Sequence, residues 1–550
     1  MAGYNLRERR RHGFVSRQIL AEGAVIAAAR AAPAAASPLA VGGQQGAAFF
    51  DFMFSELRNQ ALDAPDAKLA ELAMAMRETA GTPDDRLDNP AIPAGFTYLG
   101  QFVDHDITLD LTPLAKAMDD PEMVKNFRTP GLDLDCVYGA GPGPHRFLFA
   151  RAANASGQMV DTPSLSIGIA QESDDNVDRP GRKIRQLPND LPRNAQGVAL
   201  IGDHRNDENL IVAQIHLAFL KFHNAVVDHL AGTVPAEELF EQAAKTVRWH
   251  YQWMVLHDWV ERLTEPGIVA KILHDGRDFY RFKTKPFMPW EFSAAAYRLG
   301  HSMVRESYSH NRIFRDREPR TAGADLRTLF RFTNLSGNFI NGNGPHPDFG
   351  KGSLPSNWAI DWRRFFDLEP PADRSQFEFN LSRRLDTALV EALHNLPGSN
   401  PGTADASLAF RNLRRGVQLG LPSGQDVAKL MQEKLDFEAL TPDEIADGND
   451  GAVAKSLGFH QKTPLWFYIL KEAAVRGGGK RLGPVGGRIV AETFIGIVQG
   501  DDGSYLSQPG WKPNLPSAVP GTFFMTDLLK FVSAAEDTAN PLNGLNPVGD

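Results

Sequence analysis

The sequence has almost no cysteine. Cys136 is the only one among 550 residues, which excludes an internal disulfide framework and a metal site of several thiolates. The sequence also lacks an apolar run long enough to span a bilayer, so we expect no transmembrane segment. A basic surplus is missing as well: the formal net charge is −9 and the pI is near 6.0, whereas a nucleic-acid-binding protein usually carries a basic face. The 15 histidines leave a histidine-ligated metal open.

Hydrophobic residues make up 42% of the chain, enough to bury a large core, and their spacing is mostly helical. Thr441 and Glu444 add a capping-box signature, and residues 147–196 suggest loops with short hairpins. Neither an internal repeat nor βαβ alternation is present. We therefore predict a mainly α fold, a single large helical domain over residues 46–550 with long loops and little β-structure. The clearest helices are expected at residues 49–76, 210–230, 235–263, 290–307, 384–396, 408–415, 423–435, 464–476 and 487–498.

The N-terminal segment contains an arginine run, residues 9–11, followed by an alanine-rich stretch that faintly resembles an export signal. Glu22 and Arg30 interrupt that stretch, and it has no leucine-rich core. We interpret residues 1–45 as a flexible tail, and we expect a cytoplasmic protein or one secreted without a clear signal peptide.

Residues 97–110, TYLGQFVDHDITLD, concentrate polar side chains between aromatic and aliphatic ones. On a helix, Gln101, Asp104 and His105 share one face, while Asp106 points about a quarter-turn away. This pattern could offer an amide, a carboxylate and an imidazole to one pocket. A polar helix start with a satisfied histidine is the simpler alternative.

Three other segments carry candidate groups. GDHRNDENL has Arg205 and Glu208 three residues apart, at what we expect to be the first turn of a helix, although a solvated helix start reads the same way. YRLGHSM holds His301 in the middle of an expected helix, and RNLRRGVQLGLP holds Asn412 and, one turn later, Arg415. With the first stretch they supply what haem peroxide chemistry needs: an axial imidazole, a second imidazole, a guanidinium and orienting groups.

Read together, these motifs resemble a known family. GQFVDHDIT, LDLDCVYG, GDHRNDENL followed by HLAFLKFHN, YRLGHSM and RNLRRGVQLGLP are similar, in order, to motifs of the animal-type haem peroxidases of the peroxidase–cyclooxygenase superfamily. The resemblance covers about residues 49–516, and the compact length without cysteine pairs resembles a bacterial member. It implies an enzyme that uses hydrogen peroxide to oxidise halides, thiocyanate or small aromatic donors through a ferryl intermediate.

The resemblance implies a role for each matching residue around the haem. His105 matches the distal histidine, the base toward peroxide, and Arg205 matches its arginine partner. Gln101 matches the amide that holds water or a halide near the iron. His301 matches the proximal iron ligand, with Asn412 as the partner that orients it.

The remaining haem contacts follow from the same motifs. Arg298 and Arg415 match residues that meet the propionates of haem b. Asp104 and Glu208 match the carboxylates that form ester links to haem in family members, so covalent haem is chemically possible here. Asn209 stands where myeloperoxidase has the methionine of a third link, so the resemblance gives no sulfonium bond.

A calcium loop is also implied. Asp106, Thr129, Gly131, Asp133 and Asp135 match its ligand positions and offer carboxylates, a hydroxyl and backbone carbonyls, as Ca²⁺ prefers. Gly131 replaces an aromatic residue of the family and Asp135 a serine. A solvated acidic turn is the alternative.

Two other functions remain open. A cyclooxygenase-like or α-dioxygenase-like fatty-acid oxygenase needs a tyrosine three residues before the proximal histidine, where this chain has Arg298. Tyr297 is four residues before it and should point elsewhere. A non-catalytic, calcium-stabilised protein of the same fold would be expected to lose part of the constellation, which is intact. The histidine pairs 216 and 223, and 250 and 257, are interpreted as packing and surface residues. The sequence carries no signature of an oligomeric state.

Overall fold

The structure is a computed structural model that describes residues 50–80, 82, 84–109, 126–175, 181–315, 323–333, 353–369, 377–396, 399–540 and 542–549. The predicted tail, residues 1–45, lies outside these ranges, so its boundary with the domain stays a prediction.

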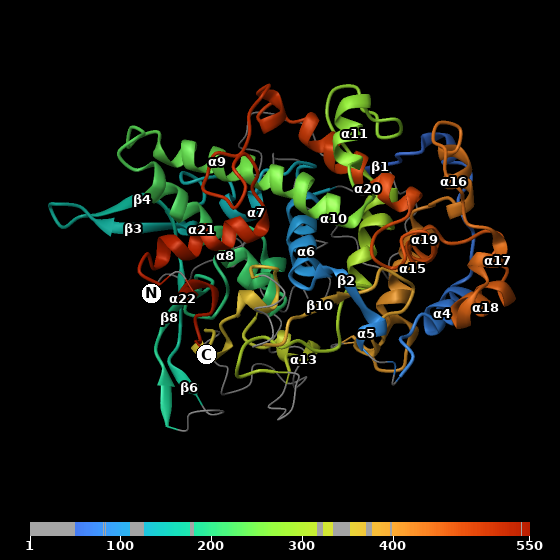
Figure 1. The fold of residues 1–550 in the computed structure, drawn as a ribbon, viewed down its shortest axis with the longest axis horizontal. Coiled ribbons are helices and arrows are strands. Elements are labelled where there is room, and N and C mark those ends of the chain that lie inside the picture. The colour runs from blue at the N-terminus through green and yellow to red at the C-terminus, as the bar shows by residue number, and fades with distance from the viewer. Residues whose placement is uncertain are drawn as a thin grey trace, which may run out of the picture.

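Helix α6 (Gly95–Ile107) lies at the centre of the molecule (Figure 1). It packs against the long helix α8 (Leu210–Leu230), which in turn packs against α9 (Leu239–Met254). The rings of Phe102 and Phe219 stack with centroids 4.5 Å apart, so α6 and α8 are joined by aromatic packing. Helix α9 continues through the π-helical turn Val255–Val260 into α10 (Glu261–Leu263).

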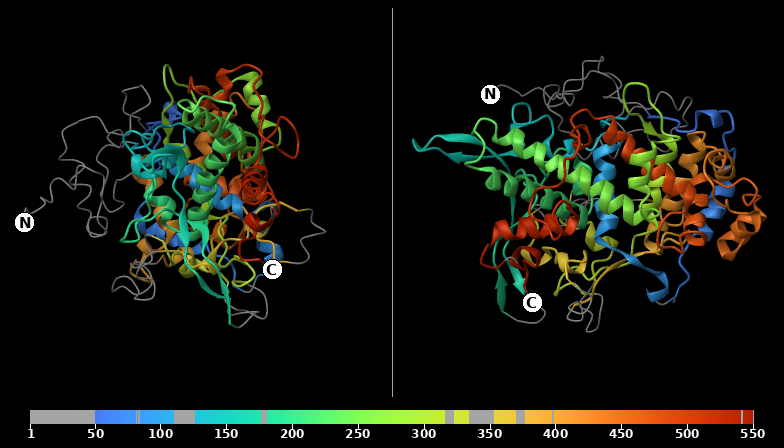
Figure 2. Two further views of the ribbon diagram at one scale, coloured as in Figure 1. Left: turned by 90° about the vertical axis from the view of Figure 1, so that its left-hand side faces the viewer. Right: turned by 45° about the horizontal axis from the view of Figure 1, so that its top comes forward.

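A second group of helices lies beside this core, on the right-hand side of Figure 1 and of the right-hand view in Figure 2. In this group α15 (Leu408–Gln418) contacts both α4 (Asp66–Ala75) and α19 (Leu465–Val475). Helix α21 (Met525–Glu536) covers α8 on the other side. The remaining α-helices are α5 (Asp84–Leu87), α7 (Asp135–Tyr138), α11 (Ile268–Asp275), α12 (Trp290–Ser293), α13 (Leu326–Leu329), α16 (Gly424–Met431), α17 (Pro442–Ile445), α18 (Gly448–Ser456), α20 (Pro484–Gln499) and α22 (Leu542–Leu545).

The strands among the described residues form two-stranded sheets only. The pair β1 and β9 is parallel and the other four are antiparallel. The β3–β4 hairpin projects away from the helical body (Figures 1 and 2). The prediction of a mainly α fold with little β-structure is therefore confirmed. The pairs are β1 (Phe50–Asp51) with β9 (Met288–Pro289), β2 (Asp88–Pro93) with β10 (Leu381–Arg383), β3 (Phe149–Ala153) with β4 (Met159–Leu165), β5 (Gly168–Ala170) with β8 (Leu187–Asp190), and β6 (Ser173–Asp175) with β7 (Arg182–Ile184).

One described helix, α8, is long and apolar enough to cross a membrane, but 94% of the relevant window is buried inside the protein. Burial on this scale identifies α8 as a core helix.

Several predicted helices are confirmed, among them α8, α15, α16, α19 and α20, and Thr441 and Glu444 form the expected capping box before α17. Three predictions are wrong. Residues 49–76 form an α-helix only from Asp66, after a single 3₁₀ turn at Ser55–Leu57, because Pro65 precedes the helix and Phe50–Asp51 pairs with β9. Residues 290–307 form α12 and a 3₁₀-helix, η7 (Ala296–His301), so His301 ends a helical element instead of lying inside one. Residues 384–396 contain only the 3₁₀-turn Glu391–His394.

Candidate active site

His105 lies buried in the last turn of α6. Its Nδ1 lies 2.8 Å from Oδ1 of Asn206, so Nδ1–H donates to the amide oxygen and the lone pair remains on Nε2. No described residue forms a hydrogen bond with Nε2. Burial, reinforced by the charge of Arg205, lowers the pKa of His105 to about 4. The side chain is therefore a neutral base with its accepting nitrogen available.

Asn206 is held in turn from α8. Its Nδ2 donates to Nδ1 of His216 at 3.0 Å, so the amide has its oxygen on His105 and its nitrogen on His216. The sequence interpretation treats His216 as a packing or surface residue, and His216 is indeed fully buried. It does not include the contact by which His216 holds the amide of Asn206. The only signal for Asn206 in the sequence is its position directly after Arg205.

Arg205 lies in a 3₁₀-helix, η5 (His204–Asp207), and not in the first turn of α8 as predicted. The long helix begins only at Leu210, because Asn209 caps it by accepting from the backbone N–H of Val212 at 3.0 Å. Glu208 directly follows η5 as its C-cap, and because residues three apart eclipse one another in a 3₁₀-helix, Glu208 stays near Arg205.

The guanidinium of Arg205 is fixed by acceptors on one side. Its Nε donates to Oδ1 of Asp203 at 3.1 Å, and Nη2 donates to Oδ2 of Asp203 at 2.8 Å. Nη2 also donates to the backbone oxygens of His105, at 2.9 Å, and Thr108, at 2.6 Å. No described residue accepts from Nη1, which leaves this nitrogen for a bound ligand. The arginine is thus tied to the same turn of α6 that carries the base.

Two residues of α6, Gln101 and Asp104, are half-buried while the rest of the helix is buried. Gln101 accepts from Nδ2 of Asn209 at 3.0 Å, and Asp104 accepts from the hydroxyl of Thr108 at 3.0 Å. Glu208 is half-buried as well, and burial raises its pKa to about 7 against the lowering effect of nearby Arg205. The structure thus leaves both carboxylates that were predicted as ester positions partly accessible.

On the proximal side, Nδ1 of His301 lies 2.7 Å from the side-chain amide nitrogen of Asn412 on α15. A half-turn of this amide puts its oxygen at the same position, where it accepts from Nδ1–H and leaves the lone pair on Nε2. No described residue bonds to Nε2 of His301. Burial, with the nearby charge of Arg298, lowers the pKa of His301 to about 3, so the imidazole is neutral and can ligate a metal.

The two sides of the site are connected. Tyr297 on η7 donates its hydroxyl to the backbone oxygen of Gly100 on α6 at 3.2 Å and accepts from Nε1 of Trp259 at 2.7 Å. The charge of Asp104 acts on both imidazoles, which puts that carboxylate near His105 and His301 alike. The proximal and distal groups therefore border one region.

Space for a flat group exists beside the proximal histidine. A Cβ built on Gly300 would meet no heavy atom within 4 Å. Arg298 is half-buried and fixed through Nε to the backbone oxygen of Ser293 at 2.8 Å, and Arg415 is half-buried one turn after Asn412 on α15. The haem that the sequence predicts fits this arrangement. The Nε2 atoms of His105 and His301 are available, space is open at Gly300, and two half-buried arginines lie nearby.

We expect Gly300→Trp to weaken haem binding by about tenfold to a hundredfold, because an indole would fill the open space beside His301 and overpacking costs ~1–3 kcal/mol. Gly300→Ala is the matched control, since its methyl group meets nothing and the backbone is not in the left-handed region. Haem titration followed by absorbance measures both variants. Equal haem affinities in the two variants would mean that the space at Gly300 is not used.

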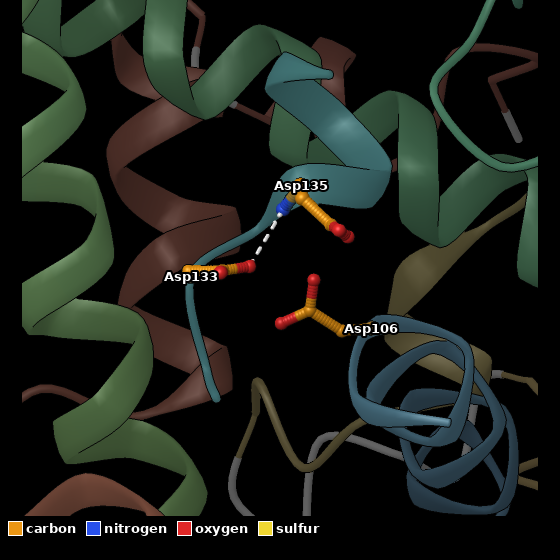
Figure 3. Close-up of side chains that lie close together, drawn as sticks. All are labelled: Asp106, Asp133 and Asp135. Atoms are coloured by element: carbon orange, nitrogen blue, oxygen red, sulfur yellow. Dashed lines mark hydrogen bonds between the residues drawn. The ribbon is translucent and has the colours of Figure 1, made fainter. Parts of the chain in front are cut away.

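Three acidic side chains converge where Asp106, the residue after His105, faces the loop that carries Asp133 and Asp135 (Figure 3). The carboxylates of Asp106, Asp133 and Asp135 supply oxygens that all lie within 4.8 Å of one another. Oδ1 of Asp106 is buried without a hydrogen-bond partner. Burial, together with Asp135, raises the pKa of Asp106 to about 7, and burial also raises the pKa values of the other two carboxyls. A hard divalent cation would satisfy the orphaned oxygen and the clustered charge, so these residues fit the predicted calcium site.

The other two predicted cation ligands adjoin this cluster. The backbone oxygen of Thr129 accepts from the N–H of Gly131 at 2.8 Å, and the Thr129 side chain is exposed. A Cβ on Gly131 would lie 4.0 Å from Oδ2 of Asp133. The structure thus brings three of the five predicted ligands together, and the roles of Thr129 and Gly131 stay predictions.

Comparisons with known proteins agree with this arrangement. The family model for animal haem peroxidases matches residues 112–341. This segment includes residues 129–135, which we call the acidic loop, as well as Arg205 and His301. A peroxidase-like protein from Margaritifera margaritifera is 26% identical over 392 residues, which is 59% of this chain and 44% of that protein. Chorion peroxidase from Drosophila melanogaster is 26% identical over 357 residues, 60% of this chain and 38% of that protein. The chain thus spans less than half the length of these two relatives.

Solved structures show the same fold. Peroxidase A from Dictyostelium discoideum superposes with a TM-score of 0.54 at 15% identity, covering 84% of this chain and 88% of that one. A fatty acid alpha-dioxygenase from Oryza sativa also gives a TM-score of 0.54, at 13% identity, covering 92% of this chain and 82% of that one. The family match, the relatives and the fold together support the assignment of this chain to the peroxidase–cyclooxygenase superfamily, to which the animal haem peroxidases belong.

Proposed function

We propose that the protein is a haem peroxidase that uses hydrogen peroxide to oxidise halides, thiocyanate or small aromatic donors. The observation that carries this proposal is His105, a buried neutral imidazole with an available Nε2 beside the fixed guanidinium of Arg205. Haem, if held by His301, would supply iron that can react with peroxide and take up its oxidising equivalents.

The residues on the distal side then have distinct tasks. Nε2 of His105 takes the proton from the peroxide oxygen that binds first and returns it to the oxygen that leaves as water. Arg205, always protonated, stabilises the negative charge that develops as the O–O bond breaks. Gln101, whose oxygen is held by Asn209, points its amide group from the half-buried face of α6 and would orient water or a halide.

The pH dependence of the peroxide step follows from His105. The step needs the unprotonated imidazole, whose pKa burial lowers to about 4. The second-order rate constant with peroxide should therefore be level from pH 5 to pH 8 and fall about tenfold per pH unit below about pH 4. Stopped-flow absorbance with pH jumps measures this profile. A midpoint near 6.5, the ordinary value for histidine, would show that His105 is not the buried base.

We further infer that Asp104 and Glu208 can form ester links to haem b, because both carboxylates are partly accessible beside the site. Peroxide turnover should then convert extractable haem to haem that stays with the denatured chain. Glu208→Ala and Asp104→Ala should each remove one link, and mass spectrometry of haem peptides reads out each link separately.

A fatty-acid oxygenase is the alternative, supported by the fold shared with alpha-dioxygenases. Such chemistry needs a tyrosine three residues before His301, and Arg298 has that place. The hydroxyl of Tyr297 is engaged with Gly100 and Trp259, so it is not free for radical chemistry on a fatty acid. These contacts favour the peroxidase.

The decisive experiment is an optical spectrum of haem-reconstituted protein beside His301→Ala, followed by peroxide. We expect a Soret band that changes in the variant and a peroxide-induced spectrum that iodide or a phenol returns to the resting state. Oxygen uptake driven only by palmitate would establish the oxygenase instead. A wild-type protein that binds no haem would refute both enzymes and leave a calcium-stabilised, non-catalytic protein.

A further inference from the structure

Arg128 connects the acidic loop to the turn that carries Arg205, two segments that lie far apart in the sequence. It lies at the start of the acidic loop, and its side chain is only 3% exposed. Nη1 donates to Oδ1 of Asp135 at 2.6 Å, at the cation cluster. On its other side, Nε donates to Oδ2 of Asp203 at 3.0 Å, and Nη2 donates to the same oxygen and to the backbone oxygen of Gly202. One guanidinium thus bridges two buried carboxylates.

The bridge continues to the distal arginine. Asp203 accepts from Arg128 and from Arg205 at once, and both its oxygens are engaged. Arg205 donates in turn to the backbone oxygen of His105. A continuous series of hydrogen-bonded charges, Asp135–Arg128–Asp203–Arg205, therefore joins the acidic loop to the group that would meet peroxide.

Charge balance makes this series sensitive to a cation. The three clustered carboxylates and Asp203 carry four negative charges, and Arg128 and Arg205 carry two positive ones, so a divalent cation brings the set to neutrality. Asp135 and Asp203 compete for Arg128. A cation that binds Asp135 weakens the attraction of Asp135 for Arg128, so Arg128 interacts more strongly with Asp203. Asp203 then attracts Arg205 less strongly.

We propose that Arg128 is a positioning residue that couples occupancy of the Asp106, Asp133 and Asp135 site to the distal arginine, Arg205. The proposal deepens the proposed peroxidase function and rests on it. Coupling between two sites is reciprocal: whatever the cation does to Arg205, the state of Arg205 does to cation affinity. This reciprocity allows a test on the protein without haem.

The test is a double-mutant cycle on the full-length apoprotein, with Ca²⁺ binding measured by calorimetry. Arg205→Met leaves Asp203 to attract Arg128 more strongly, which releases Asp135 for the cation. We expect Ca²⁺ to bind more tightly by about fivefold or more, within the usual range of allosteric coupling. In the Arg128→Met background the same Arg205→Met change should alter the affinity by less than about twofold, which is the residual through-space effect.

Two further variants keep the cycle interpretable. Arg193 is the matched control, because it also bridges two buried carboxylates, Asp190 and Asp207, outside this series. In the Arg193→Met background the Arg205 effect should remain at its full size. Arg128→Lys keeps the charge but lacks the fork that reaches both carboxylates, so it should lose most of the coupling while folding as the wild type does.

In the haem-loaded protein, cyanide affinity provides the second readout, since the bound anion reports on Arg205. Ca²⁺ should change the cyanide Kd by about fivefold or more in the wild type and by less than about twofold in Arg128→Lys. An Arg205 effect of equal size with and without Arg128, or its loss in Arg193→Met as well, would overturn the proposal. Because the calorimetric cycle needs no haem, failure of the peroxidase assignment and failure of the coupling are distinguishable.

Discussion

His105→Ala is expected to slow the reaction with hydrogen peroxide by about a thousandfold, near the middle of the range for removal of a general acid–base catalyst. The variant loses the His105 imidazole, whose Nε2 is free to accept a proton on this face of α6. Asn206 fixes the tautomer of this imidazole. Haem binding should persist, because the expected iron ligand, His301, and its partner, Asn412, are unchanged. Stopped-flow absorbance with peroxide in excess measures the rate constant, and the Soret band of the resting protein reports haem content.

A buried histidine of α8 serves as the control. His223 bonds through Nδ1 to the hydroxyl of Tyr138 at 3.1 Å and through Nε2 to the backbone oxygen of Pro163 at 2.9 Å, so both its nitrogens are used structurally. His223→Ala should lower stability and leave the peroxide rate constant within about twofold of the wild type. Asn206→Ala should give an intermediate loss, since His105 keeps its ring but loses the acceptor that selects its tautomer. A rate constant in His105→Ala within tenfold of the wild type would remove His105 from the mechanism.

The core of this fold could be predicted from sequence, and candidate site residues could be named from it, because the helical pattern and the motifs are both local. Helix α8 shows a helical apolar spacing over its whole length, and the capping box at Thr441 needs only residues three positions apart. His105, Asp106 and Arg205 were recognisable inside short motifs. The chemistry that each of these side chains can perform follows from its residue type and can be named without the structure.

The predictions that failed concern helix boundaries that depend on distant contacts or on a cap. The segment that carries His301 breaks after Ser293 and resumes as a 3₁₀-helix, where Tyr297 bonds to the backbone of Gly100 on another helix. Asn209 delays the start of α8, so Arg205 sits in a tighter turn than expected. The Arg128 bridge was invisible for the same reason: Asp203 is 75 positions away from it.

Removal of the cation that Asp106, Asp133 and Asp135 are predicted to bind is expected to destabilise the protein, and increasingly so as the pH rises. In the cation-free protein, burial and Asp135 raise the pKa of Asp106 to about 7, well above the value of ~3.9 in an unfolded chain. Between these two values the folded state binds a proton that the unfolded state has lost, so the cation-free protein loses stability as the pH rises from about 4 to about 7. Ca²⁺ binds the ionised carboxylates and replaces that proton.

The difference in Tm between calcium-saturated and EDTA-treated protein should therefore be small at pH 5 and large at pH 8. At a calcium concentration a thousand times its Kd, the stabilisation amounts to about 4 kcal/mol. Differential scanning calorimetry at both pH values measures it. Asp106→Asn should abolish most of the calcium effect at either pH, because it removes the buried carboxylate whose Oδ1 has no other partner.

Glu291→Gln separates this effect from buried acids in general. Burial raises the pKa of Glu291 to about 7 as well, but its carboxylate accepts from the backbone N–H groups of Met53, at 2.8 Å, and Phe54, at 3.1 Å, and lies outside the cluster. The variant should change the pH dependence of the cation-free protein while the calcium-induced rise in Tm at pH 8 stays at its wild-type size. A rise that is equal at pH 5 and pH 8, or one that Asp106→Asn leaves intact, would mean that calcium binds elsewhere. Calcium can bind these three carboxylates only after displacing their protons, so its effect at this site must depend on pH.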